Sequence, residues 1–113
     1  METIEAIKSR RSIRKFKEDK IPHEIVEKVI HAAVHSPSWK NTQITRYIIV
    51  ESNEIKKEIA LNYVPDFNKT IILNAPMLLA LSIVKKRSGY ERDGSFSTSK
   101  GNGWEMFDCG IAS

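Results

Sequence analysis

Cysteine is almost absent from the sequence. Cys109 is the only cysteine among the 113 residues, so no disulfide can form within the chain, and the class of disulfide-stapled secreted domains is excluded. This cysteine usage is typical of a reducing compartment, and we expect a cytoplasmic protein. No neighbouring residue would activate Cys109 as a nucleophile, so we expect its side chain to pack as a small hydrophobe.

Long apolar runs are also lacking. The longest, Ile71–Val84, is interrupted by Asn74 and Pro76 and falls short of the roughly 20 residues that a membrane-spanning helix requires. The N-terminal sequence METIEAIKSRR has no apolar core, which is unlike a secretory signal. Repeats are absent as well, and 41% of the residues are hydrophobic. The sequence therefore predicts one soluble domain, residues 1–113, with a single modest core.

Positive charge is concentrated in one segment. Between Lys8 and Lys20 there are seven basic and two acidic residues, a formal charge of +5, whereas the whole chain carries +4. Such a segment commonly binds an anion: nucleic acid, a membrane headgroup or a phosphorylated small molecule. A nucleic-acid-binding module is one hypothesis. Against it, Phe16 is the only aromatic residue of the segment, whereas proteins that bind single strands use several stacking aromatics.

Hydrophobic periodicity and capping residues predict alternating helices and strands. Helices are expected in the segments Thr3–Arg10, Pro22–Val34 and Ser52–Tyr63. Strands are expected at Arg46–Glu51 and at Pro76–Val84, the second of them buried, with a helix as the alternative there. Residues 85–103 are polar and lack periodicity, so they predict a long mobile loop. After this loop, Trp104, Phe107 and Ile111 have the spacing of a further core helix.

The sequence SRRSIRKF, residues 9–16, is the segment richest in functional chemistry. In an extended chain, alternate side chains share a face, which would bring Arg10, Ser12 and Arg14 together. A guanidinium group matches two phosphate oxygens with two parallel N–H bonds, and a serine hydroxyl can bind a sugar hydroxyl. The alternative is a solvated basic stretch between two helices.

The sequence SPSWKNTQ, residues 36–43, follows the second predicted helix. Proline, serine and asparagine are typical turn residues, but a turn has no need of Trp39 or Gln43. Asn41 and Gln43 can each donate and accept hydrogen bonds. One interpretation is that the indole of Trp39 covers an aromatic ligand or lines a substrate cavity. The alternative is that it fills the core of its own subunit.

Three motifs in this order, SRRSIRKF, SPSWKNTQ and WEMFDCGIAS (residues 104–113), resemble the FMN-dependent nitroreductase family. The resemblance implies an α+β sandwich in which helices flank a central, mostly antiparallel sheet. It also implies a homodimer with two FMN sites at the subunit interface. Members of the family continue beyond the last of these motifs with further strands, so we expect an incomplete domain whose C-terminal part is missing.

The resemblance also assigns FMN contacts, divided between two subunits. One subunit would bind the phosphate, the ribityl chain and the pyrimidine edge with Arg10, Arg11, Ser12 and Arg14. Its partner would contribute Pro37, Ser38, Trp39, Asn41 and Gln43. Asn68 matches a further contact more loosely.

The activity implied by the resemblance is that of an NAD(P)H-dependent oxidoreductase. Hydride would pass from NADH or NADPH through FMN to a nitroaromatic, a quinone or a similar small acceptor, and no catalytic side chain is expected because the flavin carries the chemistry. A cation beside the flavin, for which Arg14 is the candidate, would stabilise the reduced form. The alternative is a flavin-binding remnant without turnover.

Two other sets of residues receive weaker interpretations. His31 and His35 are one helical turn apart, but no third ligand is evident, so we expect a solvated face and no metal. Asp108 is open to two interpretations, an acid or a residue with a packing role.

Overall fold

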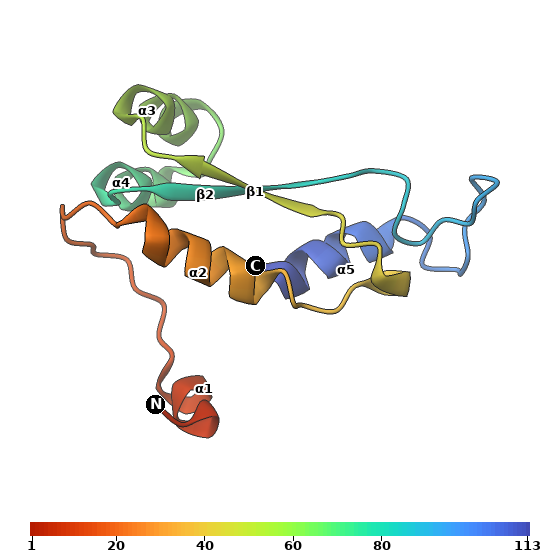
Figure 1. Ribbon diagram of the computed structural model, residues 1–113. Coiled ribbons are helices and arrows are strands. Elements are labelled where there is room, and N and C mark those ends of the chain that lie inside the picture. The colour runs from red at the N-terminus through yellow and green to blue at the C-terminus, as the bar shows by residue number, and fades with distance from the viewer.

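A computed structural model describes all of residues 1–113. The chain forms five α-helices and two strands, together with a short 3₁₀ turn, η1; Figure 1 shows their arrangement. In chain order they are α1 (Thr3–Ser9), α2 (His23–Ala33), η1 (Trp39–Asn41), β1 (Thr45–Val50), α3 (Asn53–Asn62), α4 (Asp66–Asn74), β2 (Leu78–Ile83) and α5 (Gly103–Ala112).

The two strands form one antiparallel sheet. Thr45 lies opposite Ile83 and Val50 lies opposite Leu78, so the strands pair along their full lengths. Helix α5 packs against both strands, and α3 and α4 pack on each other. Figure 1 shows the α3–α4 pair at one end of the sheet, with α5 toward the other end. The α+β class predicted from the sequence is confirmed.

The predicted helix and strand positions agree with local signals in the chain. Helix α2 begins directly after Pro22, whose fixed φ suits a helix start. The hydroxyl of Ser52 accepts a hydrogen bond from the backbone N–H of Ile55 at 3.3 Å, which makes Ser52 the N-cap of α3. Four of the six residues of β1 are β-branched and a fifth, Tyr47, is aromatic, as expected for a pleated surface.

Helix α4 is absent from the sequence-based prediction. In the apolar run Ile71–Val84 only Pro76–Val84 was predicted to have regular structure, but the run contains the end of α4 as well as the whole of β2. A start signal is present, because Pro65 precedes the helix and Asp66 provides an acidic first turn. The helix ends at Asn74, two residues before Pro76, which could not continue it.

The N-terminal segment extends away from the rest of the chain (Figure 1). All residues from 1 to 25 are exposed, and residues 10–22 between α1 and α2 form neither helix nor strand. Helix α1 therefore leaves its two isoleucines uncovered: Ile4 is 62% exposed and Ile7 is 67% exposed. We call residues 10–22 the N-terminal arm.

The core is small, with nine buried residues among 113. Its apolar members are Val26, Ile44, Val50 and Ala60. The prediction that α5 turns Phe107 and Ile111 toward the core is wrong, because these side chains are 59% and 41% exposed. The buried face of α5 instead carries Glu105 and Asp108, since two loops present hydrogen-bond donors to this face.

Strand β2 is confirmed as a strand, but it is not fully buried. Residues 78–81 are half-buried and Ser82 is exposed, because the sheet has only two strands and α5 covers only part of it. None of the helices is both long enough and apolar enough to cross a membrane.

Candidate functional site

Residues 37–43, which we call the Trp39 turn, connect α2 to β1. The backbone N–H of Asn41 donates to the carbonyl of Ser38 at 3.0 Å, and that of Thr42 donates to the carbonyl of Trp39 at 3.1 Å. The Ser38 hydroxyl accepts a hydrogen bond from the backbone N–H of Gln43 at 2.9 Å. Short polar side chains thus close the turn, as turn chemistry predicts.

The Trp39 turn contains three residues with left-handed backbone angles. The φ values are +44° for Lys40, +54° for Asn41 and +47° for Gln43. Residues other than glycine seldom adopt this conformation, and each costs about 1–3 kcal/mol unless its surroundings enforce it. The turn therefore depends on contacts with other parts of the chain.

The carboxylate of Asp108 provides the main contact of this kind. Asp108 is only 2% exposed, and both of its oxygens lie 3.1 Å from the backbone nitrogen of Trp39, which donates to them. The Ser88 hydroxyl donates to Oδ2 at 2.5 Å and lies 2.5 Å from the Thr42 hydroxyl. No basic side chain forms an ion pair with Asp108, so hydrogen bonds alone compensate its burial. Of the two interpretations of Asp108, an acid or a residue with a packing role, this geometry favours the packing role.

A second buried carboxylate holds the loop that precedes α5. Glu105 is 8% exposed, and its Oε1 accepts the backbone N–H of Lys86 at 2.7 Å. Further along the loop, the Trp104 indole donates to the Thr98 hydroxyl at 2.9 Å. The predicted absence of helix and strand from residues 85–103 is confirmed for residues 85–102, apart from one isolated bridge, Tyr90 to Phe96, whereas Gly103 already belongs to α5. We call these residues the 85–102 loop.

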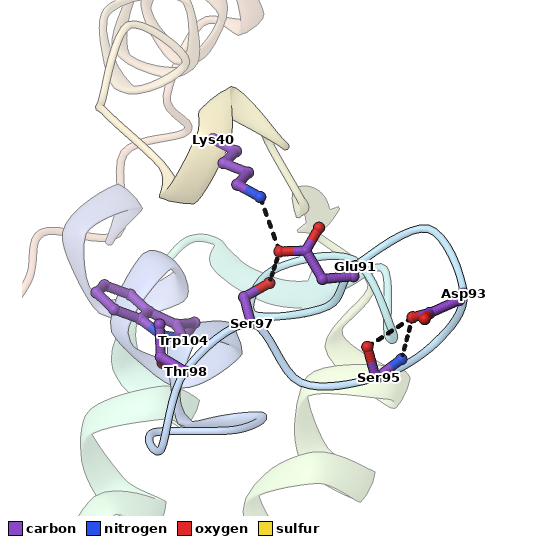
Figure 2. A network of polar contacts seen from close by, with 7 residues as sticks. All are labelled: Lys40, Glu91, Asp93, Ser95, Ser97, Thr98 and Trp104. Atoms are coloured by element: carbon purple, nitrogen blue, oxygen red, sulfur yellow. Dashed lines mark hydrogen bonds and ion pairs between the residues drawn. The ribbon is translucent and has the colours of Figure 1, made fainter.

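An ion pair links the 85–102 loop to the Trp39 turn (Figure 2). The ammonium of Lys40 lies 3.0 Å from Oε1 of Glu91, and the Ser97 hydroxyl donates to the same oxygen at 2.6 Å. The hydrogen bond from Ser97, followed by the interaction with Lys40, lowers the pKa of Glu91 below its ordinary value of 4.5. Figure 2 also shows Asp93 and Ser95, which pair with each other farther along the loop.

The lowered pKa of Glu91 predicts a pH dependence of this link. Above pH 4.5 the carboxylate is charged and the pair with Lys40 is present; as the pH falls through the lower pKa of folded Glu91, protonation removes it. The Lys40 ammonium lies 4.6 Å from the Trp39 ring centroid, so we expect tryptophan fluorescence to change in this acidic range. Glu91→Gln should lack the transition, and an identical transition in both proteins would contradict the assignment.

The indole of Trp39 lies beside a second tryptophan. Its ring centroid is 6.5 Å from that of Trp104, and Trp104 in turn makes an edge-to-face contact with Phe107 at 5.7 Å. Trp39 is half-buried, so its ring is not enclosed in the core of its own chain. One part of the ring remains available to a ligand or to another chain.

The predicted donors of the N-terminal arm are exposed and available. The side chains of Arg10, Ser12 and Arg14 make no hydrogen bond or ion pair within the chain, whereas Arg11 donates to the carbonyls of Lys8 and Arg10 at 3.0 and 2.8 Å. Residues 10–16 lie outside any helix or turn, and the sharing of a face by the first three side chains stays a prediction. Within one chain, no hydrogen bond or ion pair joins the arm to the Trp39 turn.

The remaining predicted residues lie elsewhere. Asn68 is on α4, which Figure 1 places at the opposite end of the sheet from η1. The rings of His31 and His35 are 5.1 Å apart, but no group of three potential metal ligands occurs in the structure. Cys109 is half-buried and unpaired. One chain therefore does not bring Asn68 to the other candidate residues.

The donor set of the Trp39 turn fits a polar, planar group such as a flavin. The side chains of Asn41 and Gln43 are exposed and have no hydrogen-bond partner in the chain, so both amides are free to bind carbonyl and N–H groups at a ring edge. A pocket of about 110 Å³ is lined by Pro37, Ser38 and Gln43 of the turn together with Tyr47 of β1. The Tyr47 hydroxyl donates to the carbonyl of Ala112, which also lines the pocket, at 2.6 Å.

Comparison with known proteins gives one consistent family. Residues 7–63 match the Nitroreductase family. A nitroreductase family protein from Clostridium novyi NT has a similar structure, with a TM-score of 0.75 and 32% identity, covering 99% of this chain. An FMN-dependent nitroreductase from Clostridium difficile R20291 gives a TM-score of 0.72 and 26% identity over 97% of this chain. Iodotyrosine deiodinase from Nematostella vectensis is 31% identical over 58 residues, or 51% of this chain.

The chain spans only part of these relatives. It covers 59% of the Clostridium novyi protein, 55% of the Clostridium difficile enzyme and 22% of the deiodinase. The match nevertheless extends over the N-terminal arm, the Trp39 turn and β1, and the structural similarity extends over nearly all of the chain. These findings confirm the predicted nitroreductase-like fold, and the chain belongs to the Nitroreductase family.

Proposed function

We propose that residues 1–113 form a single FMN-binding domain of an NAD(P)H-dependent oxidoreductase. The observation that carries the proposal is the separation of two free sets of polar groups. The N-terminal arm presents Arg10, Ser12 and Arg14, and the Trp39 turn presents Asn41 and Gln43, all without partners in their own chain. Two copies can satisfy both sets with one ligand at their interface.

Relatives support the choice of FMN as this ligand. Among similar structures, one is a complex with FMN and two others are named FMN-dependent nitroreductases. Several curated relatives carry NAD(P)H nitroreductase in their names. We therefore propose a homodimer that uses NADH or NADPH to reduce a nitroaromatic, a quinone or a similar small acceptor.

The residues of the chain would bind and orient the cofactor. Arg10 would bind the phosphate, because a guanidinium group offers two parallel donors, and Ser12 would bind a ribityl hydroxyl. Arg14 would lie at the pyrimidine edge, where its fixed charge favours electron uptake. Arg11 would add a further FMN contact from the N-terminal arm. The partner subunit would contact FMN through Pro37, Ser38, Trp39, Asn41 and Gln43, and Asn68 is a further candidate. When bound, FMN supplies the hydride-transfer chemistry.

The absorption spectrum of the purified protein tests the proposal. FMN is added, the protein is desalted, and NADH or NADPH is then added without oxygen. We expect flavin absorption to remain after desalting and to bleach on reduction. Flavin retained without bleaching would restrict the function to binding, and flavin lost from a folded protein would contradict FMN binding by residues 1–113.

An Arg14→Ala variant tests the assigned contact. A hydrogen bond to a charged group contributes about 1.5–3 kcal/mol, so we expect the Kd for FMN to rise by roughly 10- to 100-fold and the reduction potential of bound flavin to fall. Lys17→Ala removes the same charge from the same exposed arm and provides the control. If both variants retain the affinity and potential of the unmodified protein, Arg14 has no such role.

A further inference from the structure

A second candidate site lies between the Trp39 turn and the 85–102 loop. It is a groove of about 650 Å³ whose walls combine the residues 39–42 with Lys86, Arg87 and the residues 90–92. Four of its side chains are basic and one is acidic, so the groove carries a formal charge of +3. This surface is distinct from the basic N-terminal arm.

Three of the basic side chains are free to bind a ligand. Lys40 is paired with Glu91, but Lys86, Arg87 and Arg92 are exposed and make no ion pair or side-chain hydrogen bond. Clustered cations without partners repel one another. An anion between them would relieve that repulsion and gain hydrogen bonds, most strongly from the arginines.

Hydrogen bonds to two buried carboxylates hold the backbone around Lys86 and Arg87 in place. Lys86 adopts a φ of +61°, an unfavourable conformation for a side-chain-bearing residue, while its N–H is bound by the buried carboxylate of Glu105. Two residues later, Ser88 is fully buried and bonded to Asp108. The wall opposite the Trp39 turn is therefore anchored by two buried carboxylates, which argues against a freely moving surface stretch.

Aromatic rings supply the apolar part of the groove. Trp39 and Tyr90 both line it. The Tyr90 ring makes a tilted contact with that of Phe96, at 5.0 Å between centroids. Aromatic rings on the wall of a groove offer a face for stacking a planar molecule.

We propose that this groove binds small planar aromatic compounds that carry a carboxylate. The ring would stack on Trp39 or Tyr90, and the carboxylate would be bound by Arg87 and its basic neighbours. As Trp39 and Asn41 also belong to the proposed FMN contacts, the inference extends the proposed function: the preferred electron acceptor is an anionic aromatic compound.

Direct binding to the flavin-free protein tests the groove without relying on activity. The probes are 4-nitrobenzoate and its neutral analogue 4-nitrobenzamide, followed by tryptophan fluorescence and by calorimetry. We expect about fivefold tighter binding of the carboxylate at low salt, in line with the modest strength of exposed ion pairs, and a smaller difference at high salt. Equal affinity of the two compounds would overturn the proposal.

Charge reversal identifies the responsible residues. Arg87→Glu, and separately Arg92→Glu, should weaken 4-nitrobenzoate binding by about tenfold while leaving 4-nitrobenzamide nearly unaffected, because two like charges replace an attraction. Lys57→Glu, at an exposed position of α3, is the control with the same change in net charge. Circular dichroism establishes that each variant is folded. An equal loss in Lys57→Glu would overturn the assignment, since it would indicate only an effect of net charge.

Adenosine 2′,5′-bisphosphate is a third binding probe, because its adenine ring is planar and its phosphates are anionic. If it binds more tightly than 4-nitrobenzoate and loses affinity in Arg87→Glu, the groove serves the nicotinamide cosubstrate and the assignment to the acceptor is overturned. The flavin-retention experiment is independent of these measurements. Failure of FMN binding with intact 4-nitrobenzoate binding would contradict the proposed function while leaving the groove as an anion site.

Discussion

Asp108→Ala is expected to lower the free energy of unfolding by about 3 kcal/mol, because it leaves buried donors without an acceptor. The carboxylate accepts the backbone N–H of Trp39 and the hydroxyl of Ser88, and Ser88 is fully buried. The Trp39 turn would also lose its anchor, so its three left-handed residues would relax. Urea denaturation followed by tryptophan fluorescence measures the effect.

Asp93→Ala is a closely matched control. Asp93 also accepts hydrogen bonds from a backbone N–H and a serine hydroxyl, at 2.9 and 2.6 Å from Ser95, but it is exposed. Water replaces the lost acceptor there, and we expect a change below about 1 kcal/mol. Asp108→Asn keeps one acceptor oxygen and should fall between the two. Similar losses for Asp93→Ala and Asp108→Ala would exclude a special role for the buried carboxylate.

If the proposed function holds, Asp108 also matters for the cofactor. The residues predicted to bind FMN include Trp39, Asn41 and Gln43. The carboxylate of Asp108 accepts a hydrogen bond from the backbone N–H of Trp39. Asp108 is therefore a positioning residue. It holds the Trp39 turn and makes no hydrogen bond to the side-chain amides of Asn41 and Gln43, which would bind FMN. We expect Asp108→Asn to retain FMN more weakly than Asp93→Ala does.

Most of the secondary structure could be predicted from local signals. Helix α2 follows a proline and has an apolar stripe, and α3 has a serine cap. These signals lie within a few residues of the elements they specify, so no knowledge of the fold is needed. Helix α4 was missed because its apolar residues Ile71–Leu73 were grouped with those of β2 in one interrupted run, although the Pro65–Asp66 start signal was available.

The buried face of α5 could not be predicted in the same way. The spacing of Trp104, Phe107 and Ile111 identifies an apolar face, but it does not say whether this chain covers that face. The acids at positions 105 and 108 are buried because they bind backbone groups 19 and 69 residues away. Such pairings depend on how the two loops converge, and no local pattern records them.

The candidate site divides along the same line. The Trp39 turn and the N-terminal arm are continuous segments whose residue types predict ligand binding, and the resemblance to nitroreductases assigns FMN contacts to both. Ser88 and Thr42, by contrast, are ordinary polar residues until the fold brings their hydroxyls to 2.5 Å from each other. The basic groove likewise joins two segments more than 40 residues apart.

Gly89→Ala is expected to lower the free energy of unfolding by about 3 kcal/mol or more, through strain and overlap together. Gly89 is buried and has a φ of +86°. A Cβ atom there would lie 2.3 Å from the carbonyl oxygen of Gly101 and 2.9 Å from Cδ1 of Trp104. The first of these atoms belongs to the backbone and cannot rotate away, so the base of the 85–102 loop would have to move.

Gly94→Ala separates the two causes of this loss. Gly94 has the same φ of +86°, but a Cβ atom there would meet nothing within 4 Å, so only the backbone strain, about 1 kcal/mol, is expected. The difference between the two variants, measured by urea denaturation, therefore reports the overlap with Gly101. Because the Cβ atom would also press on Trp104, only Gly89→Ala should shift the tryptophan emission of the native state. Equal destabilisation by the two variants would mean that the base of the 85–102 loop can shift without loss of stability. Lys86 and Arg87 beside the groove would then be anchored much more weakly than the contacts of Glu105 and Asp108 indicate.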